Sequence, residues 1–270
     1  MKKSSWNATS AAACVLALSL EVLAVAGWVR THSPAAPILA LVGPVQPRIA
    51  MPLPMPSVAV QQAAPVVTPA VDPEDSYYAQ LRSKIHWVET RIGTDKLLTP
   101  DDSSRVLLAK SAADRAGLRE VGLSFKDVYG IISAETSWIP RMGASKDGTP
   151  NLGLAQFEPA TARALGLRNP NDPVEAIHVA AMHMKEAAEW SANRIAGLKL
   201  SAVDRAERLR EGVSIFYNLS SRGRNRWNGR NTEKLPIETR LHIRNARTGA
   251  QYAAELEAQQ ASSGFMLTGG

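Results

Sequence analysis

A proline-rich stretch limits where this chain can fold. Residues 34 to 73 hold ten of the 17 prolines, and up to Val71 they contain a single charged residue, Arg48. Proline fixes φ and lacks a backbone donor, so this stretch favours a semi-extended chain of about 3 Å per residue over helices or strands. We therefore expect a disordered linker over residues 30–73 and one folded domain over residues 74–270.

The sequence before this linker is typical of an export segment. Two lysines near the start precede an apolar run over residues 11–29, and Ala-Val-Ala at positions 24–26 is a small-residue cleavage motif. If the run is retained instead, it is just long enough to span a bilayer, with Glu21 costing about 2 to 3.5 kcal/mol. We expect residues 1–29 to be a cleaved signal peptide or an inner-membrane anchor, and the domain to be periplasmic.

The composition adds two limits. Cys14, the only cysteine, lies inside the export segment, so the domain must fold without an intrachain disulfide. The chain carries 31 Lys and Arg against 25 Asp and Glu, a net charge of +6. This basic balance suits an acidic partner such as a wall polymer rich in carboxylates, although ordinary solubility explains it equally well.

Apolar residues spaced alternately by three and four predict helices along the domain. An opening helix before Gly93 is marked by Tyr78, Leu81, Ile85, Val88 and Ile92. A second long helix is marked by Val174, Ile177, Ala181, Met184 and Ala188, and a third by Ala206, Leu209, Val213 and Phe216. No stretch has the alternation of a strand, so we expect an all-α domain.

Glu135 lies on a helix with an apolar face. Ser124 followed by Asp127 is a helix-start signature, and position 139, before a proline, is a stop, so the pattern predicts one helix over residues 125–139. The apolar face carries Val128, Ile131, Ile132 and Trp138. Each lies three, four or seven residues from Glu135. An apolar setting and the last helical turn both disfavour an ionised carboxyl, which suits a general acid, although a surface glutamate or a structural ion pair would share the pattern.

Three further motifs follow Glu135 in a fixed order. They are Gly153-Leu154-Ala155-Gln156 leading to Pro159-Ala160-Thr161-Ala162, then Phe216-Tyr217-Asn218, and then Leu235-Pro236-Ile237-Glu238-Thr239. With the glutamate, this order resembles the soluble lytic transglycosylase (SLT) domain family, part of the lysozyme-like superfamily, over roughly residues 120–250. The chain departs from the family pattern: Thr136 replaces Ser, Ala155 replaces Met, Phe216 replaces Ala, and residues 145–151 form a longer stretch.

The resemblance implies a lysozyme-like helical domain that cleaves the β-1,4 bond between N-acetylmuramic acid (MurNAc) and N-acetylglucosamine (GlcNAc) in peptidoglycan. It implies that Glu135 protonates the linking oxygen and then, as a carboxylate, deprotonates the muramyl 6-hydroxyl, which leaves a 1,6-anhydromuramyl end. Such a lyase needs no metal and no organic cofactor. The substrate-binding or supporting residues that the resemblance implies are Thr136, Ser137, Gly153, Gln156, Tyr217 and Asn218.

The residues themselves also allow plainer roles. Gly153 lets backbone approach closely, or it forms an ordinary turn before a helix. Gln156 offers a donor and an acceptor to sugar groups. Tyr217 ends an apolar stripe and is either a core tyrosine or, as the resemblance implies, a hydrogen-bond donor to Glu135. Asn218 either caps that helix or binds sugar.

Most glycosidases use two carboxylates, and families that lack the second can use the N-acetyl group of the substrate. Asp147, Glu158 and Asp172 are available here, but the resemblance marks none of them as catalytic. Two alternatives to the lyase therefore stay open. One is a muramidase that uses water in place of the 6-hydroxyl, and the other is a non-catalytic wall-binding component of a secretion or conjugation apparatus.

Other clusters predict no further chemistry. His178 and His183 are five residues apart and so lie on different faces of a helix, which argues against a metal pair. The arginines between positions 222 and 230, with Trp227 among them, could suit nucleic acid, but no nucleic-acid motif accompanies them, and a loop bordering the sugar cleft is favoured. We expect peptidoglycan glycan strands as the partner, secretion or conjugation machinery as a further one, and no nucleic acid.

Overall fold

The computed structural model describes residues 73–145 and 147–267. The predicted export segment, and all of the predicted linker except Pro73, lie outside these residues. The described part is mostly helical, as the spacing of the apolar residues predicts. None of its helices is both long enough and apolar enough to cross a membrane.

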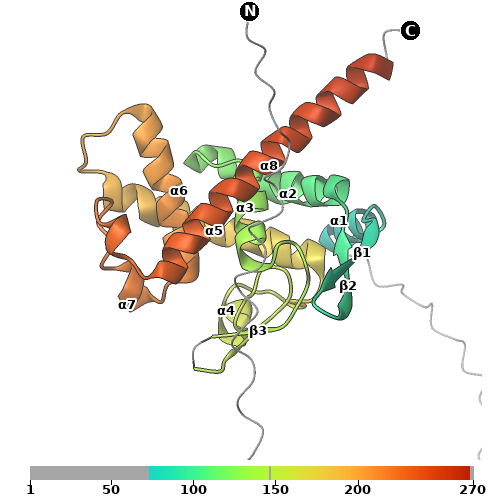
Figure 1. Ribbon diagram of the computed structural model, residues 1–270, viewed down its shortest axis with the longest axis horizontal. Coiled ribbons are helices and arrows are strands. Elements are labelled where there is room, and N and C mark those ends of the chain that lie inside the picture. The colour runs from blue at the N-terminus through green and yellow to red at the C-terminus, as the bar shows by residue number, and fades with distance from the viewer. Residues whose placement is uncertain (1–72, 146, 268–270) are drawn as a thin grey trace, which may run out of the picture. The chain divides into compact units, whose positions relative to one another are not determined.

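The described residues form eight α-helices, α1 (Pro73–Arg82), α2 (Asp102–Ala116), α3 (Phe125–Thr136), α4 (Pro159–Ala164), α5 (Pro173–Ile195), α6 (Ala202–Asn218), α7 (Ser221–Arg224) and α8 (Ile237–Leu267) (Figure 1). Two 3-10 turns lie between them, η1 (Leu118–Val121) and η2 (Thr232–Lys234). Two short antiparallel pairs complete this part, β1 (Trp87–Ile92) with β2 (Asp95–Pro100) and β3 (Gly143–Ala144) with β4 (Pro150–Asn151).

The opening helix is shorter than its apolar spacing predicts. α1 ends at Arg82 and the chain then forms the β1–β2 hairpin, so the expectations of a helix reaching Ile92 and of a domain without strands are wrong. Val88 and Ile92 are 44% and 40% exposed, so the later part of the stripe does not face the core. β-Branched residues favour strands, and Gly93, with φ of 60°, makes the two-residue turn at the tip.

α3 begins where the sequence predicts and ends earlier. Ser124 and Asp127 form a capping box, in which the Ser124 N–H donates to Asp127 Oδ2 at 2.8 Å. The helix ends at Thr136 instead of position 139, because Ser137 and Trp138 adopt left-handed conformations with φ of 54° and 65°. This turn buries the Trp138 ring, whose Nε1–H donates to a serine hydroxyl on α3.

The predicted helices of the second half of the domain are confirmed. α5 buries all five residues of its predicted stripe, and α6 buries Val213 and Phe216. The main core draws on α2, α3, α5, α6 and α8. A smaller core cluster of Ile195, Ile215, Trp227 and Leu235 joins the ends of α5 and α6 to the segment before α8.

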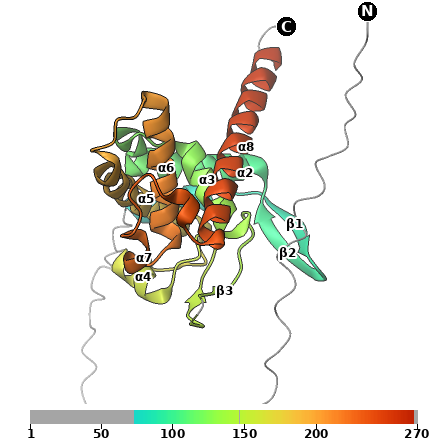
Figure 2. The same ribbon diagram turned by 60° about the vertical axis from the view of Figure 1, so that its left-hand side comes forward.

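α3 packs against α8 more extensively than against any other described element, and Figures 1 and 2 both show α8 lying across it. Two glycines allow this close crossing. A Cβ at Gly130 would collide with the carbonyl oxygen of Ala246, and a Cβ at Gly249 would lie 3.0 Å from the Gly130 Cα. The crossing sets the last turn of α3 beside the first turns of α8.

Candidate active site

Glu135 occupies the last turn of α3, where its carboxyl group meets α8. A hydrogen bond of 2.8 Å joins Glu135 Oε1 to Nε2 of His242, and the two side chains are 16% and 5% exposed. The other oxygen, Oε2, has no hydrogen-bond partner among the described residues. The predicted apolar face is present, since Val128, Ile131, Ile132 and Trp138 are all buried. The carboxyl is therefore held by one oxygen and left unbound at the other.

His242 is the member of this site that the sequence motifs do not reveal. It lies 107 residues after Glu135, on the first turns of α8. Its other ring nitrogen, Nδ1, is buried and has no hydrogen-bond partner in the described part of the chain. The buried seam of α8 continues with spacings of three and four at Ala246, Gly249, Ala253 and Leu256. A histidine on such a seam needs a polar partner on a neighbouring helix. The presence of a histidine in an otherwise apolar stripe is therefore the sequence signal that could indicate His242.

Tyr217 lies at the end of α6, near the same carboxyl. Its hydroxyl donates to the carbonyl oxygen of Ala155 at 3.5 Å, a long hydrogen bond. Burial, and then the charge of the nearby Glu135, raise the pKa of Tyr217 well above its ordinary value, so the phenol keeps its proton. In place of the Tyr217–Glu135 hydrogen bond that the resemblance implies, the structure joins the carboxyl to His242 and the phenol to Ala155.

The loop of the second motif is braced from within. Gly153, with φ of 69°, lies so close to Pro170 that a Cβ would collide with the Pro170 carbonyl, so the predicted close approach is to protein backbone. Nε2 of Gln156 donates to the carbonyl oxygens of Gly153 and Arg141 at 2.8 and 2.9 Å. Both amide protons are therefore engaged, and Gln156 supports the loop without a donor left over for sugar.

Two more of the predicted site residues also act as supports. Thr136 is fully buried, and its hydroxyl donates to the carbonyl oxygen of Leu154 at 3.0 Å. Asn218 is the last residue of α6, and its Oδ1 accepts from the Thr239 hydroxyl at 2.8 Å, so it links α6 to α8 and does not cap its own helix. Ser137 is exposed, directly after the end of α3.

The three other acids considered from the sequence are engaged in local structure. Asp172 caps the start of α5 and pairs with Arg82. Glu158 accepts a hydrogen bond of 2.6 Å from a serine hydroxyl of the β3–β4 hairpin. Hydrogen bonds from Thr149 hold the pKa of Asp147 below its ordinary value. None of the three makes a hydrogen bond to Glu135.

The two α5 histidines lie in separate surroundings, as their spacing predicts. His178 is buried, with Nε2 at 2.9 Å from the Ser111 hydroxyl, and His183 packs against the rings of Phe216 and Tyr217. In the part of the chain that the structure describes, no three His, Cys, Asp or Glu side chains are grouped so as to hold a metal ion.

The arginine-rich segment after α6 does not offer its tryptophan to a ligand. Trp227 is fully buried and stacks on Trp190 with 5.7 Å between ring centroids, and its Nε1–H donates to the Thr232 hydroxyl. Arg224 lies over the Phe216 ring at 3.6 Å. Trp227 is therefore a core residue, and stacking on a base or a sugar is not its role.

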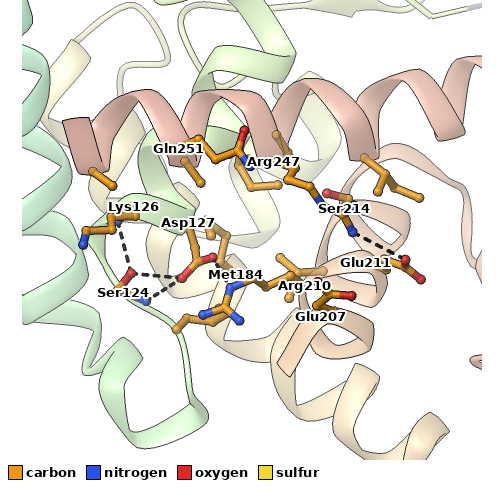
Figure 3. Close-up of a pocket in the computed structure, with 17 residues that line it drawn as sticks. Ser124, Lys126, Asp127, Met184, Glu207, Arg210, Glu211, Ser214, Arg247 and Gln251 are labelled. Atoms are coloured by element: carbon orange, nitrogen blue, oxygen red, sulfur yellow. Dashed lines mark hydrogen bonds and ion pairs between the residues drawn. The ribbon is translucent and has the colours of Figure 1, made fainter. Parts of the chain in front are cut away.

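A cavity of about 360 Å³ lies between α3, α6 and α8, and Glu135 does not line it. Figure 3 shows Asp127 beside Arg210 and Arg247 facing Glu211 at this cavity. Asp127 Oδ1 accepts from Arg210 Nε at 2.7 Å, and Arg247 lies 3.8 Å from Glu211. Asp127 and Glu211 are therefore paired with arginines within the protein.

The arrangement around Glu135 suits proton transfer. An oxygen without protein hydrogen bonds can give a proton to an oxygen atom of a bound molecule and take one back, while the hydrogen bond from His242 to the other oxygen fixes the direction of the carboxyl group.

Comparisons of the chain with protein-family models, with curated proteins and with solved structures gave no match.

Proposed function

We propose that this protein is a lytic transglycosylase that cleaves the MurNAc–GlcNAc β-1,4 bond of peptidoglycan. The observation that carries the proposal is the carboxyl group of Glu135, half-buried at the end of α3, held at Oε1 and unbound at Oε2. A general acid needs this combination of a fixed direction and an oxygen that can reach the substrate.

Hydrogen bonds that join the four motifs to one another support the proposal. The Thr136 hydroxyl of the first motif donates to the carbonyl oxygen of Leu154 in the second motif at 3.0 Å. The Tyr217 hydroxyl of the third motif donates to the carbonyl oxygen of Ala155 in the second motif at 3.5 Å. The third is joined to the fourth by the bond of 2.8 Å between Asn218 and Thr239. Residues scattered over a hundred positions are thus joined into one connected set, as parts of one site should be.

The proposed reaction is balanced in protons. Glu135 gives the proton on Oε2 to the oxygen that links the two sugars, and the bond between that oxygen and muramyl C1 breaks. The muramyl 6-hydroxyl oxygen then bonds to C1, and its proton returns to Oε2. No water is consumed, and the product carries a 1,6-anhydro ring.

The surroundings of the other acids favour the lyase over a hydrolase. A hydrolase of the usual kind needs a second carboxylate to activate water or to form a covalent intermediate. Asp147, Glu158 and Asp172 instead hold their own loops and helix ends. An intramolecular hydroxyl also has the advantage of proximity over a solvent molecule.

The test compares two acid-to-amide variants on purified sacculi. Glu135→Gln should abolish release of soluble muropeptides while the melting temperature stays near that of the wild type. The control, Glu158→Gln, alters a carboxylate of similar size that bonds a serine of the β3–β4 hairpin, and it should retain activity. Substantial turnover by folded Glu135→Gln protein would refute the proposal, and loss of activity in Glu158→Gln alone would move the catalytic role to that acid.

A periplasmic location belongs to the same proposal, because the substrate lies in the cell wall and residues 1–29 predict export or an inner-membrane anchor. Secretion or conjugation machinery stays a proposed partner. Cell fractionation with protease protection of intact spheroplasts tests the location, and protection of the domain from external protease would contradict it.

A further inference from the structure

His242 has two ring nitrogens with very different surroundings. Nε2 lies 2.8 Å from Oε1 of Glu135, whereas Nδ1 is buried without a partner among the described residues. The side chain is only 5% exposed, and Nδ1 has no contact with bulk solvent. The position of the ring proton therefore decides what His242 can do for the carboxyl group.

Three proton arrangements are conceivable, and burial separates them. A proton on Nδ1 would leave a buried N–H donor unpaired, which folded proteins seldom tolerate. Protons on both nitrogens would add a buried positive charge to the same unpaired donor. A proton on Nε2 alone gives the ring one hydrogen bond to Oε1 and leaves only a lone pair without a partner. The geometry favours this last form.

We infer that His242 is a positioning residue for Glu135: its Nε2–H donates to Oε1 throughout the reaction and assigns the proton transfers to Oε2. The inference rests on the proposed function, and it specifies which carboxyl oxygen reacts. When Glu135 is protonated, the proton lies on Oε2 and points away from the ring. After it is given up, the Nε2–H stabilises the carboxylate until the 6-hydroxyl proton arrives.

The other polar groups near the carboxyl do not compete for Oε1. Tyr217, from α6, gives its hydrogen bond to Ala155. Arg141, from the segment after α3, donates to the backbone carbonyl oxygen of Glu135 at 3.2 Å and not to its carboxyl. Arg240, earlier on α8, lies 3.8 Å from the carboxylate of Glu233. His242 is thus the described side chain that bonds the Glu135 carboxyl.

The first experiment measures the ring proton directly, without activity. The full-length protein is labelled with ¹⁵N-histidine, and the two ring nitrogens of His242 are assigned by comparison with His242→Gln. We expect a protonated-type shift for Nε2 and an unprotonated-type shift for Nδ1 at neutral pH. A proton on Nδ1, or on both nitrogens, would overturn the inference.

The second experiment separates positioning from packing. His242→Gln keeps an N–H donor near the place of Nε2, and His242→Phe keeps a ring without a donor. On a soluble, uncross-linked glycan fragment, we expect His242→Phe to lose at least about tenfold in kcat with little change in KM, and His242→Gln to stay within about threefold of the wild type. Equal rates for the two variants would mean that the donor has no role.

A matched control removes another buried ring. His178→Phe replaces a buried histidine that bonds Ser111 and makes no hydrogen bond to Glu135. It should lower the melting temperature and leave kcat unchanged. If His242→Phe fails to fold, the ¹⁵N spectrum still shows which ring nitrogen carries the proton, and the rate of His242→Gln still shows whether an amide donor can replace the ring. If the wild type forms no anhydromuramyl product, the proposed function fails, while the proton position on His242 is still measured.

Discussion

A Cβ added at Gly249 would lie 3.0 Å from the Cα of Gly130, so the backbones of α3 and α8 nearly touch where they cross. Both members of the central pair depend on this crossing. Glu135 follows Gly130 on α3 by little more than one turn, and His242 precedes Gly249 on α8 by two turns. The distance between the two helices at the glycines therefore sets the distance between the carboxyl and the ring.

We predict that Gly249→Ala damages the site through this crossing. The new methyl would lie 2.6 Å from Ser133 Cβ, and overpacking of this kind costs about 1–3 kcal/mol, against the gain of about 1 kcal/mol for Ala over Gly in a helix. Urea unfolding and the rate on sacculi should both fall. Gly197→Ala is the control, because a Cβ there meets nothing within 4 Å. A Gly249→Ala protein as stable and active as the control would contradict the role of the crossing.

We predict that Tyr217→Phe has a small effect. The hydroxyl bonds Ala155 at 3.5 Å and makes no hydrogen bond to Glu135, so its removal should change the rate by less than about threefold and leave the ring packing intact. Steady-state rates of Tyr217→Phe and the wild type, measured with Glu135→Gln as the inactive reference, test this prediction. A fall of tenfold or more would show that the phenol acts on the substrate or the carboxyl during the reaction.

His183 should make the fold less stable in mild acid. Burial lowers the pKa of His183 below its ordinary value of 6.5, and the nearby Glu186 opposes the change only in part. The neutral ring therefore contributes stability that is fully present above about pH 6.5 and is lost as the pH falls through the folded-state pKa. In urea titrations below pH 6.5, His183→Gln should show a flatter decline than the wild type. Parallel declines would exclude this histidine as the source.

Local patterns predicted the parts of the fold that depend on neighbouring residues. The start of α3 follows from Ser124 and Asp127, and the stripes of α5 and α6 do face the core. The sequence does not reveal the β1–β2 hairpin, because Val88 and Ile92 also fit helical spacing and Gly93 is equally typical of a helix end. The early end of α3 depends on two left-handed residues that are not glycine, which no local pattern signals.

The site was predictable only in part, for a related reason. Glu135 stands out by its place on an apolar face, but its partner His242 is 107 residues away on a helix whose crossing depends on two glycines. Gln156 carries the right groups for sugar binding, yet its amide protons bond two backbone carbonyls instead. Residue chemistry indicates which groups can react, whereas tertiary contacts decide which remain free to do so.

The most direct test of the proposed reaction is digestion of purified sacculi in oxygen-18 water, followed by mass spectrometry of the soluble muropeptides. If the 6-hydroxyl closes the ring and Glu135 only moves protons, the glycan ends will be 1,6-anhydromuramyl and will carry no oxygen-18, since no water enters the product. Glu135→Gln protein should release neither product. A majority of reducing ends labelled with oxygen-18 would contradict the lytic transglycosylase and establish a muramidase in its place.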